Sequence, residues 1–232
     1  MGRAIAEVLA GEGARIAVCD IDGDGVREVA EAIDAAGGEA LWMKTDVTRE
    51  DEVRELIEKA LHRFGNVGIL VNNAGVLRST PVDEITKAEW DQVLGVNLNG
   101  TFLCTAAVLP AMKANGSGRI INMSSSAGRS VSTLGGAHYT TSKAAVLGFT
   151  RALAKEVAPF GITANAVCPG LIDTEMVRRN CSPEQLAAYE KSFPVPRLGT
   201  PEEVARLVLF LCVDAPYITG ASIDINGGDL ML

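Results

Sequence analysis

The sequence has few histidines and fewer positive than negative charges. It contains 21 Lys and Arg against 29 Asp and Glu, a formal net charge of −8 at pH 7. Binding to a phosphate backbone needs clustered positive charge instead. The two histidines, His62 and His138, lie far apart in the sequence. We therefore expect no nucleic-acid partner and no bound metal.

Disulfides, membrane spans and secretion signals are also not indicated. The five cysteines are scattered and form no Cys-x-x-Cys pair, as in reduced cytoplasmic proteins. No apolar run reaches the length needed to span a bilayer, so we expect no membrane partner. Arg3 and Glu7 interrupt the apolar pattern at the start, unlike a secretory signal. We expect a cytoplasmic protein.

Short apolar stretches alternate with segments of helical periodicity along the whole chain. Their near-continuous hydrophobicity is typical of parallel strands that are covered on both faces. The expected strands are Arg15–Asp20, Glu39–Asp46, Gly68–Asn73, Arg119–Ser124, Thr163–Cys168 and Ser222–Ile225. The alternation predicts an α/β fold, a single doubly wound parallel-sheet domain over residues 1–232.

Several expected helices carry start signals. Ser182 and Thr200 each precede a Pro and a Glu, and each has Gln or Glu three residues later, as in a capping box. Thr86 with Glu89 predicts a third capping box.

Small and polar residues follow five of the expected strands. In doubly wound sheets, ligands bind beyond the carboxyl ends of the strands. The same residue types are also common in turns, so each residue alone is weak evidence for a ligand site. The residues are Asp20, Asp46, Asn73-Ala74-Gly75, Ser124-Ser125 and Pro169-Gly170.

Tyr139 and Lys143 are four residues apart in a segment that reads as one long helix. Both side chains therefore project from the same face. A cation beside a phenol favours the ionised form and lowers its pKa from about 10. We expect Tyr139 to act as a general acid/base near neutral pH.

These residues and their order resemble the short-chain dehydrogenase/reductase family. The match comprises Asn72-Asn73-Ala74-Gly75, Asn97, a serine near position 125, and Tyr139 with Lys143. The resemblance implies a Rossmann-type domain and the catalytic set Asn97, Ser125, Tyr139 and Lys143. In that set Tyr139 exchanges a proton with the substrate oxygen, a serine binds the substrate carbonyl, and Asn97 holds a water in a proton relay. Lys143 holds the nicotinamide ribose.

Two serines compete for the catalytic position. Counting thirteen residues back from Tyr139 gives Ser126, whereas the register of the preceding strand gives Ser125. We favour Ser125 because the sheet fixes strand register, while the following loop can absorb an extra residue.

The resemblance also implies a set of cofactor-binding residues. Asp20 would accept hydrogen bonds from the adenosine ribose, which favours NAD over NADP. The full expected set is Gly2, Asp20, Asp46, Val47, Asn73, Ala74, Gly75, Tyr139, Lys143, Pro169, Gly170, Ile172 and Thr174.

The start of the chain departs from the family pattern. The family has a strand followed by Thr-Gly-x-x-x-Gly-x-Gly, and here only Gly2 and its neighbours match. The first strand and most of the glycine-rich loop are missing, which should leave two central strand edges unpaired. Met1 is either internal to a longer native chain or the true start of a chain with weakened cofactor binding.

A rival motif begins at the end of the expected strand Arg15–Asp20. The segment from Asp20 to Glu31 matches the EF-hand calcium pattern. We expect a helix to begin inside it, which would turn Glu31 away from Asp20 and leave no calcium site.

The function expected from these residues is NAD(H)-dependent interconversion of a secondary alcohol and a ketone. One alternative is a 3-oxoacyl-thioester (acyl carrier protein) reductase that uses NADPH, and another is an inactive cofactor-binding or structural homologue. Residues 173–196 resemble the family's substrate lid. The resemblance also implies a homotetramer.

Overall fold

The computed structural model describes residues 1–232 and shows the α/β architecture that the sequence predicts. The strands are β1 (Ile16–Asp20), β2 (Ala40–Lys44), β3 (Ile69–Asn72), β4 (Gly118–Met123), β5 (Ile162–Pro169) and β6 (Ser222–Ile225). The α-helices are α1 (Gly2–Gly11), α2 (Gly23–Ala35), α3 (Glu50–Phe64), α4 (Lys87–Leu94), α5 (Gly100–Asn115), α6 (Ala137–Val157), α7 (Glu175–Asn180), α8 (Pro183–Ser192) and α9 (Pro201–Val213).

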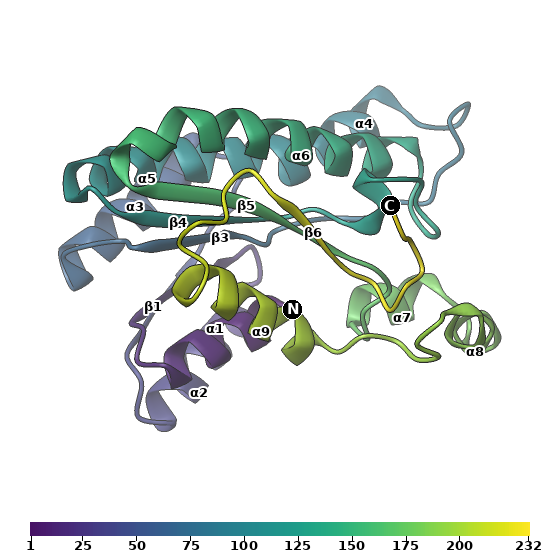
Figure 1. Ribbon diagram of the computed structural model, residues 1–232, viewed down its shortest axis with the longest axis horizontal. Coiled ribbons are helices and arrows are strands. Elements are labelled where there is room, and N and C mark those ends of the chain that lie inside the picture. The colour runs from purple at the N-terminus through teal and green to yellow at the C-terminus, as the bar shows by residue number, and fades with distance from the viewer.

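Parallel strands form the centre of the molecule, with helices on both faces. Helices α5 and α6 cover one face of the sheet, and α1 and α9 lie on the other (Figure 1). The face under α1 and α9 is sealed by Ile5 and Leu9 of α1, Ile121 of β4 and Val208 and Leu211 of α9. Burial of these apolar side chains is the main stabilising contribution to such a layered structure.

The opposite face is packed by α5 and α6. Val108 and Met112 of α5 and Val157 of α6 lie against Ile120 of β4 and Ile162 of β5, all almost inaccessible to solvent. Strand β5 is buried along its whole length because it is covered on both faces and paired on both edges.

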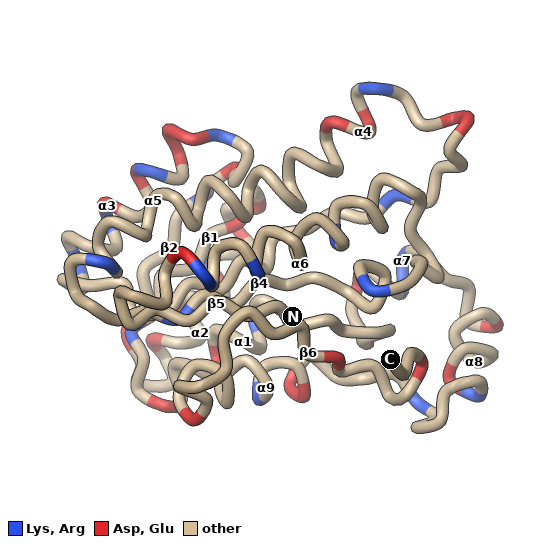
Figure 2. The backbone as a smooth tube through the Cα atoms, turned by 45° about the horizontal axis from the view of Figure 1, so that its top comes forward, with Lys and Arg blue, Asp and Glu red and all other residues tan.

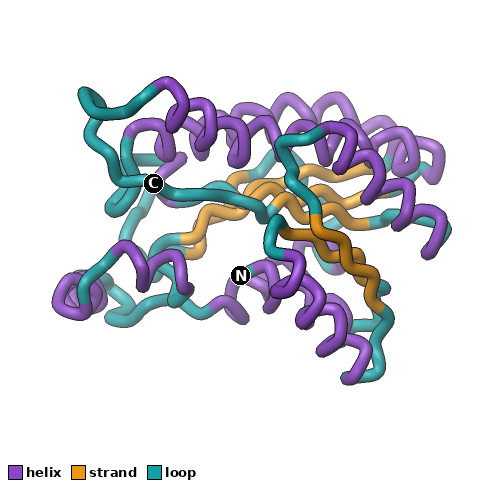
Figure 3. The backbone as a smooth tube through the Cα atoms, turned by 180° about the vertical axis from the view of Figure 1, so that it is seen from behind, coloured by secondary structure: helices purple, strands orange, loops and turns teal.

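The strands form two separate hydrogen-bonded groups. Strand β1 pairs only with β2, and the other four pair in the order β3-β4-β5-β6, all parallel. No ladder joins β1 to β3, and Figure 3 shows the two sets of strands diverging. The unpaired edges lie where the sequence predicts them, and β1 and β3 are correspondingly half-exposed.

Two of the three predicted capping boxes form, and the third does not. Both hydrogen bonds of the box are present at Ser182 and at Thr200. Thr86 accepts the N–H of Glu89, but the Glu89 carboxylate does not return to Thr86. It contacts His138 of α6 instead, so a tertiary contact replaces the local one.

Helices α4 and α5 are joined by a π-helical turn, Gly95–Asn99, into one 29-residue helix over Lys87–Asn115. This helix is long and apolar enough to cross a membrane, by length and composition only, whereas we expected no such run. Its Val108 and Met112 pack into the core, and core helices of soluble proteins pass the same test.

The segment that matches the calcium motif folds as a strand end followed by a helix. Asp22 caps α2 by accepting the N–H of Gly25, so the helix begins inside the motif, as predicted. Asp24 and Glu31 both pair with Arg27 on the surface of α2. These carboxylates are therefore engaged as helix-surface ion pairs.

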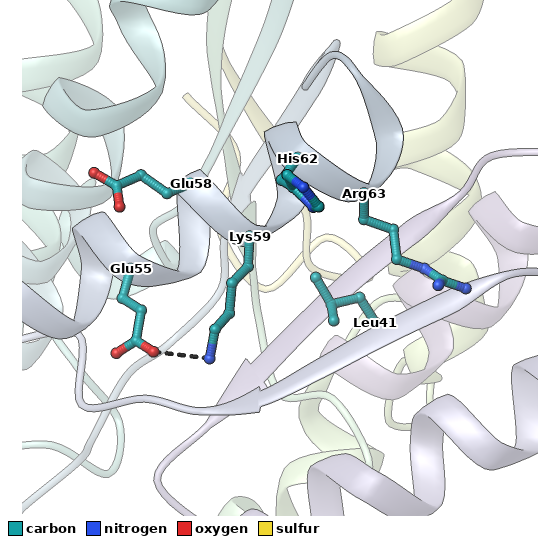
Figure 4. A pocket seen from close by; sticks show the side chains of 6 residues that line it. All are labelled: Leu41, Glu55, Glu58, Lys59, His62 and Arg63. Carbon is teal, nitrogen blue, oxygen red and sulfur yellow. Dashed lines mark ion pairs between the residues drawn. The ribbon is translucent and has the colours of Figure 1, made fainter.

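Positively and negatively charged residues alternate along the outer helices (Figure 2). A surface hollow of about 420 Å³ lies between α3 and β2 (Figure 4). Its Lys59 pairs with Glu55 at 2.8 Å, and its Arg63 pairs with Glu39 at 3.0 Å. The hollow is thus an ordinary salt-bridged helix surface that shares no residue with the predicted site.

Candidate active site

Tyr139, Lys143, Ser125 and Asn97 come together where α6 passes the carboxyl ends of β3, β4 and β5. The buried Lys143 Nζ donates a hydrogen bond to the carbonyl of Met123, the last residue of β4, at 2.7 Å. The same Nζ lies 5.9 Å from the centre of the Tyr139 ring. The four-residue spacing on α6 therefore places both groups on the face that the sequence predicts.

Ser125, rather than Ser126, contacts the tyrosine. Its side chain is the one that acts, by hydrogen bonding, to lower the pKa of Tyr139 against the larger effect of burial. Ser125 Oγ also lies 3.4 Å from the carbonyl oxygen of Pro169 and accepts the N–H of Ala127. Ser126 begins the 3-10 turn Ser126–Gly128. The strand register thus locates the serine that adjoins Tyr139.

The pKa of Tyr139 moves opposite to our expectation. Burial raises it above 10, and the hydrogen bond from Ser125 opposes that rise. Burial also lowers the pKa of Lys143 from 10.5 to about 8, because its ammonium has lost solvent. The expected lowering by a neighbouring cation is absent because the lysine contacts the Met123 carbonyl rather than the phenol oxygen.

Asn97 lies in the π-helical turn and is almost fully buried. Its side chain exchanges two hydrogen bonds with the backbone of Val76, at 2.8 and 3.0 Å. Its Nδ2 also lies 3.0 Å from Ser142 Oγ, which donates to the Tyr139 carbonyl at 2.7 Å. Asn97 is therefore connected to the backbone of Tyr139 through Ser142, a residue that we did not predict.

A network of buried polar side chains joins the strands and helices that carry these residues. Asn72 of β3 donates to Asn122 of β4 at 2.8 Å and to Thr105 of α5 at 3.1 Å. Asn122 in turn donates to Thr150 of α6 at 2.9 Å. Satisfied buried hydrogen bonds of this kind hold strands and helices in one relative position. The only sequence signal for them is polar residues inside apolar runs.

A glycine is required beside the tyrosine ring. A Cβ on Gly135 would lie 2.6 Å from Tyr139 Cδ1, closer than real contacts allow. A Cβ on Gly75 would lie 3.4 Å from Asn97 Oδ1 and 3.5 Å from Lys143 Nζ. Both glycines leave space at the groups that the sequence assigns to catalysis.

The predicted cofactor residues line the same edge of the sheet. Asp20 ends β1, and its Oδ1 accepts the N–H of Asp22, so the carboxylate also opens the turn into α2. Asp46 similarly accepts the N–H and hydroxyl of Thr48, while Val47 is buried. Both aspartates keep a second carboxylate oxygen beyond these local bonds.

Two features at this edge fit a dinucleotide. Asn73 Oδ1 is buried and has no hydrogen-bond partner. Gly2 lies against Asn73, because a Cβ added to Gly2 would stand 2.8 Å from Asn73 Nδ2. No side chain caps the N-terminus of α1. Uncapped N–H groups at a helix N-terminus suit a phosphate. The residues present therefore fit a nicotinamide dinucleotide.

The remaining predicted residues follow β3 and β5. Ala74 is exposed, and Gly170 donates its N–H to Ile225 of β6. Ile172 is buried and pairs in a short bridge with Gly199. Thr174 accepts the N–H of Val177 and so caps α7. The Thr174 hydroxyl is thus already engaged in helix capping.

Comparisons with known proteins agree with this fold and residue set. A family profile described as "Enoyl-(Acyl carrier protein) reductase" matches residues 1–229. The chain is 41% identical to a 3-oxoacyl-[acyl-carrier-protein] reductase of Synechocystis sp., over 100% of this chain and 93% of the relative. It is 38% identical to one from Escherichia coli, again over 100% of this chain and 93% of the relative.

Solved structures show the same fold. A crystal structure of a 3-oxoacyl-[acyl-carrier protein] reductase from Brucella melitensis superimposes with a TM-score of 0.93 at 36% identity, covering 100% of this chain and 87% of that one. Another from that organism, with bound NAD, gives 0.92 at 35% identity and the same coverage. The chain belongs to the short-chain dehydrogenase/reductase family, whose members are NAD(P)-binding oxidoreductases.

Proposed function

We propose that the protein reduces the 3-oxo group of an acyl thioester carried by an acyl carrier protein, with NADH as the reductant. The observation that carries this proposal is the full-length similarity, near 40% identity, to several reductases of that name. It replaces the simple alcohol and ketone substrates of our first expectation with the alternative that the relatives favour.

The residues of the site supply the chemistry that such a reduction needs. The nicotinamide would supply the hydride. Ser125 would donate a hydrogen bond to the substrate carbonyl oxygen, and Tyr139 would deliver the proton to that oxygen. The raised pKa of Tyr139 keeps the phenol protonated, as a proton donor requires.

Lys143 and Asn97 would orient the cofactor and the tyrosine. Lys143 would hold the nicotinamide ribose, and its Nζ is fixed by the Met123 carbonyl at 2.7 Å. Asn97 would hold a relay water and is itself fixed by Val76 and Ser142. Positioning of this kind lowers the barrier without new chemistry.

The preference for NADH over NADPH rests on Asp20. Its carboxylate stands at the end of β1, where it would accept the ribose hydroxyls and repel a 2′-phosphate. The Brucella melitensis reductase with bound NAD shows that a relative of this name accepts the unphosphorylated dinucleotide.

The chain would act as one domain with a substrate lid at residues 173–196. Helices α7 and α8 project from the body of the molecule (Figure 1). Helix α8 has no buried residue, while Phe193 at its end is buried. A weakly anchored segment that carries the apolar side chains of Met176 and Phe193 would suit closure over an acyl chain.

Steady-state kinetics with an acetoacetyl thioester of acyl carrier protein, against a panel of simple ketones, test the substrate. We expect kcat/KM for the thioester to exceed that for every ketone. Equal values would return the assignment to a general ketone reductase, and no turnover with bound NADH would favour a non-enzymatic homologue. Equal kcat/KM values with NADPH and NADH would overturn the cofactor preference. So would an Asp20→Ala variant in which the ratio of these two values is unchanged.

A further inference from the structure

The start of α6, which carries Tyr139, is held by contacts that the proposed chemistry does not use. Its N-cap, Gly136, has no side chain to accept the first N–H groups of the helix. Thr140 is bonded back to the Gly136 carbonyl at 3.2 Å. The N–H of Tyr139 comes one residue too early for such a bond.

The side chain of His138 takes that N–H instead. Its Nδ1 accepts from the backbone of Tyr139 at 3.1 Å, and its ring is fully buried. Because Nδ1 accepts, the proton of the neutral imidazole resides on Nε2. Nε2 then donates to Glu89 Oε1 at 2.8 Å.

Glu89 makes this contact in place of the local hydrogen bond to Thr86 in its own helix. A glutamate at its position in α4 would ordinarily complete the capping box with Thr86. Here a hydrogen bond from Thr80 and the contact with His138 hold its carboxylate and lower its pKa. A departure from a local rule, compensated only by a tertiary contact, is a mark of functional sites.

The surrounding loop closes the arrangement. The Gly136 N–H donates to the carbonyl of Arg78 at 2.7 Å, and a Cβ on Gly136 would lie 2.6 Å from the Thr80 carbonyl oxygen. Helix α4 packs beside the start of α6 (Figure 1), and the Glu89–His138 hydrogen bond joins the two helices. At the other end of Tyr139, Ser142 donates to its carbonyl.

We propose that His138 is a positioning residue for Tyr139, holding the tyrosine N–H through Nδ1 while Glu89 fixes the imidazole through Nε2. Both backbone groups of Tyr139 are then held by side chains, one by His138 and one by Ser142. The phenol oxygen is thereby kept at Ser125. The consequence for turnover rests on the proposed function, whereas the contact itself does not.

Two substitutions separate the nitrogens of the ring. In His138→Asn the amide oxygen stands near the place of Nδ1 and can still accept the Tyr139 N–H, but the side chain is too short to reach Glu89. In His138→Gln the amide reaches Glu89 and leaves the Tyr139 N–H without an acceptor. His62→Asn, at the exposed histidine of α3, is the matched control.

The first measurement is amide hydrogen exchange of Tyr139 by NMR. We expect His138→Gln to speed exchange about tenfold, the worth of one hydrogen bond, while His138→Asn and His62→Asn stay close to wild type. Glu89→Ala should also speed exchange, because the imidazole loses its tether. Equal protection in the Asn and Gln variants, or no effect of Glu89→Ala, would overturn the proposal.

The second measurement is turnover at saturating substrate and cofactor. We expect kcat of His138→Gln to fall on the order of 10- to 100-fold with KM little changed, as for a misplaced catalytic group, and His138→Asn to recover most of it. A purely structural role would lower the melting temperature of both variants and leave kcat alike. If the wild type reduces no thioester, the proposed function fails and the exchange data alone decide the role of His138.

Discussion

At the scale of single residues, Lys143 is a buried cation whose burial lowers the stability of the fold. Its ammonium has one neutral partner, the Met123 carbonyl, and burial lowers its pKa to about 8. Below pH 8 the lysine is charged in both the folded and the unfolded chain, so the full cost of burial is present. Between pH 8 and 10.5 the unfolded chain binds more protons, and stability from this group rises with pH.

Replacement of Lys143 by Met should therefore stabilise the protein and abolish turnover. A pKa shift from 10.5 to about 8 corresponds to roughly 3 kcal/mol, reduced by about 1 kcal/mol for the lost hydrogen bond. We expect Lys143→Met to raise the free energy of unfolding by about 1–3 kcal/mol at pH 7. The gain should shrink towards pH 10.5.

Urea unfolding at pH 7 and pH 10 measures this difference. Lys59→Met, on the exposed surface of α3, is the control and should show no comparable pH dependence. A Lys143→Met variant that is less stable than wild type at pH 7 would contradict the expected burial cost.

The two adjacent serines give a second prediction at this scale. Ser125 acts on the pKa of Tyr139, whereas Ser126 starts the short 3-10 turn. We expect Ser125→Ala to lower kcat on the order of 100-fold or more, the usual loss for one donor to a reacting oxygen. Ser126→Ala should retain most activity, and the reverse ranking would refute the assignment.

At the scale of elements, β1 is paired along one edge only. The Ile16 N–H donates to the carbonyl of Glu39, the residue before β2. Alternation along the strand therefore turns the N–H groups of Ala17 and Cys19 to the other side. That side has no partner strand. Unpaired strand edges of this kind open easily.

Hydrogen exchange should reveal this difference between strands. We expect the amides of Ala17 and Cys19 to exchange at least on the order of 100-fold faster than that of Val167 in the doubly paired β5, because unbonded groups need no opening. Val18, whose N–H faces β2, is the internal comparison. Equal protection of Ala17, Val18 and Cys19 would show that another strand pairs with β1 in solution.

At the scale of the whole molecule, α5 and α6 present a partly exposed aromatic pair at the surface. Phe102 of α5 is 53% exposed and meets Phe149 of α6 edge-on, with ring centres 6.5 Å apart. Exposed aromatic residues of this kind are enriched in subunit interfaces. We propose that this surface joins subunits in a homotetramer.

Light scattering after size-exclusion chromatography tests the assembly. We expect the mass of four 24.4-kDa chains for the wild type and a smaller species for Phe102→Glu, because the interface would bury an unpaired charge. Tyr217→Glu, at a fully exposed loop residue outside these helices, should leave the mass unchanged. A monomeric wild type would remove the proposal.

The sequence by itself determined the features that depend on neighbouring residues. Periodicity located all six strands to within one or two residues, and the four-residue spacing placed Tyr139 and Lys143 on one face of α6. The capping residues Ser182 and Thr200 could also be identified from the sequence. A helix face, a strand register and a cap are set by local geometry.

Only the tertiary structure decided what depends on residues brought together from far along the chain. The raised pKa of Tyr139 comes from burial, which reverses the lowering that the sequence predicts. Ser142 reaches Asn97 across 45 positions, and His138 reaches Glu89 across 49. The last contact outweighs a predicted capping box, because a buried imidazole without a partner would cost more than an exposed helix end without its glutamate.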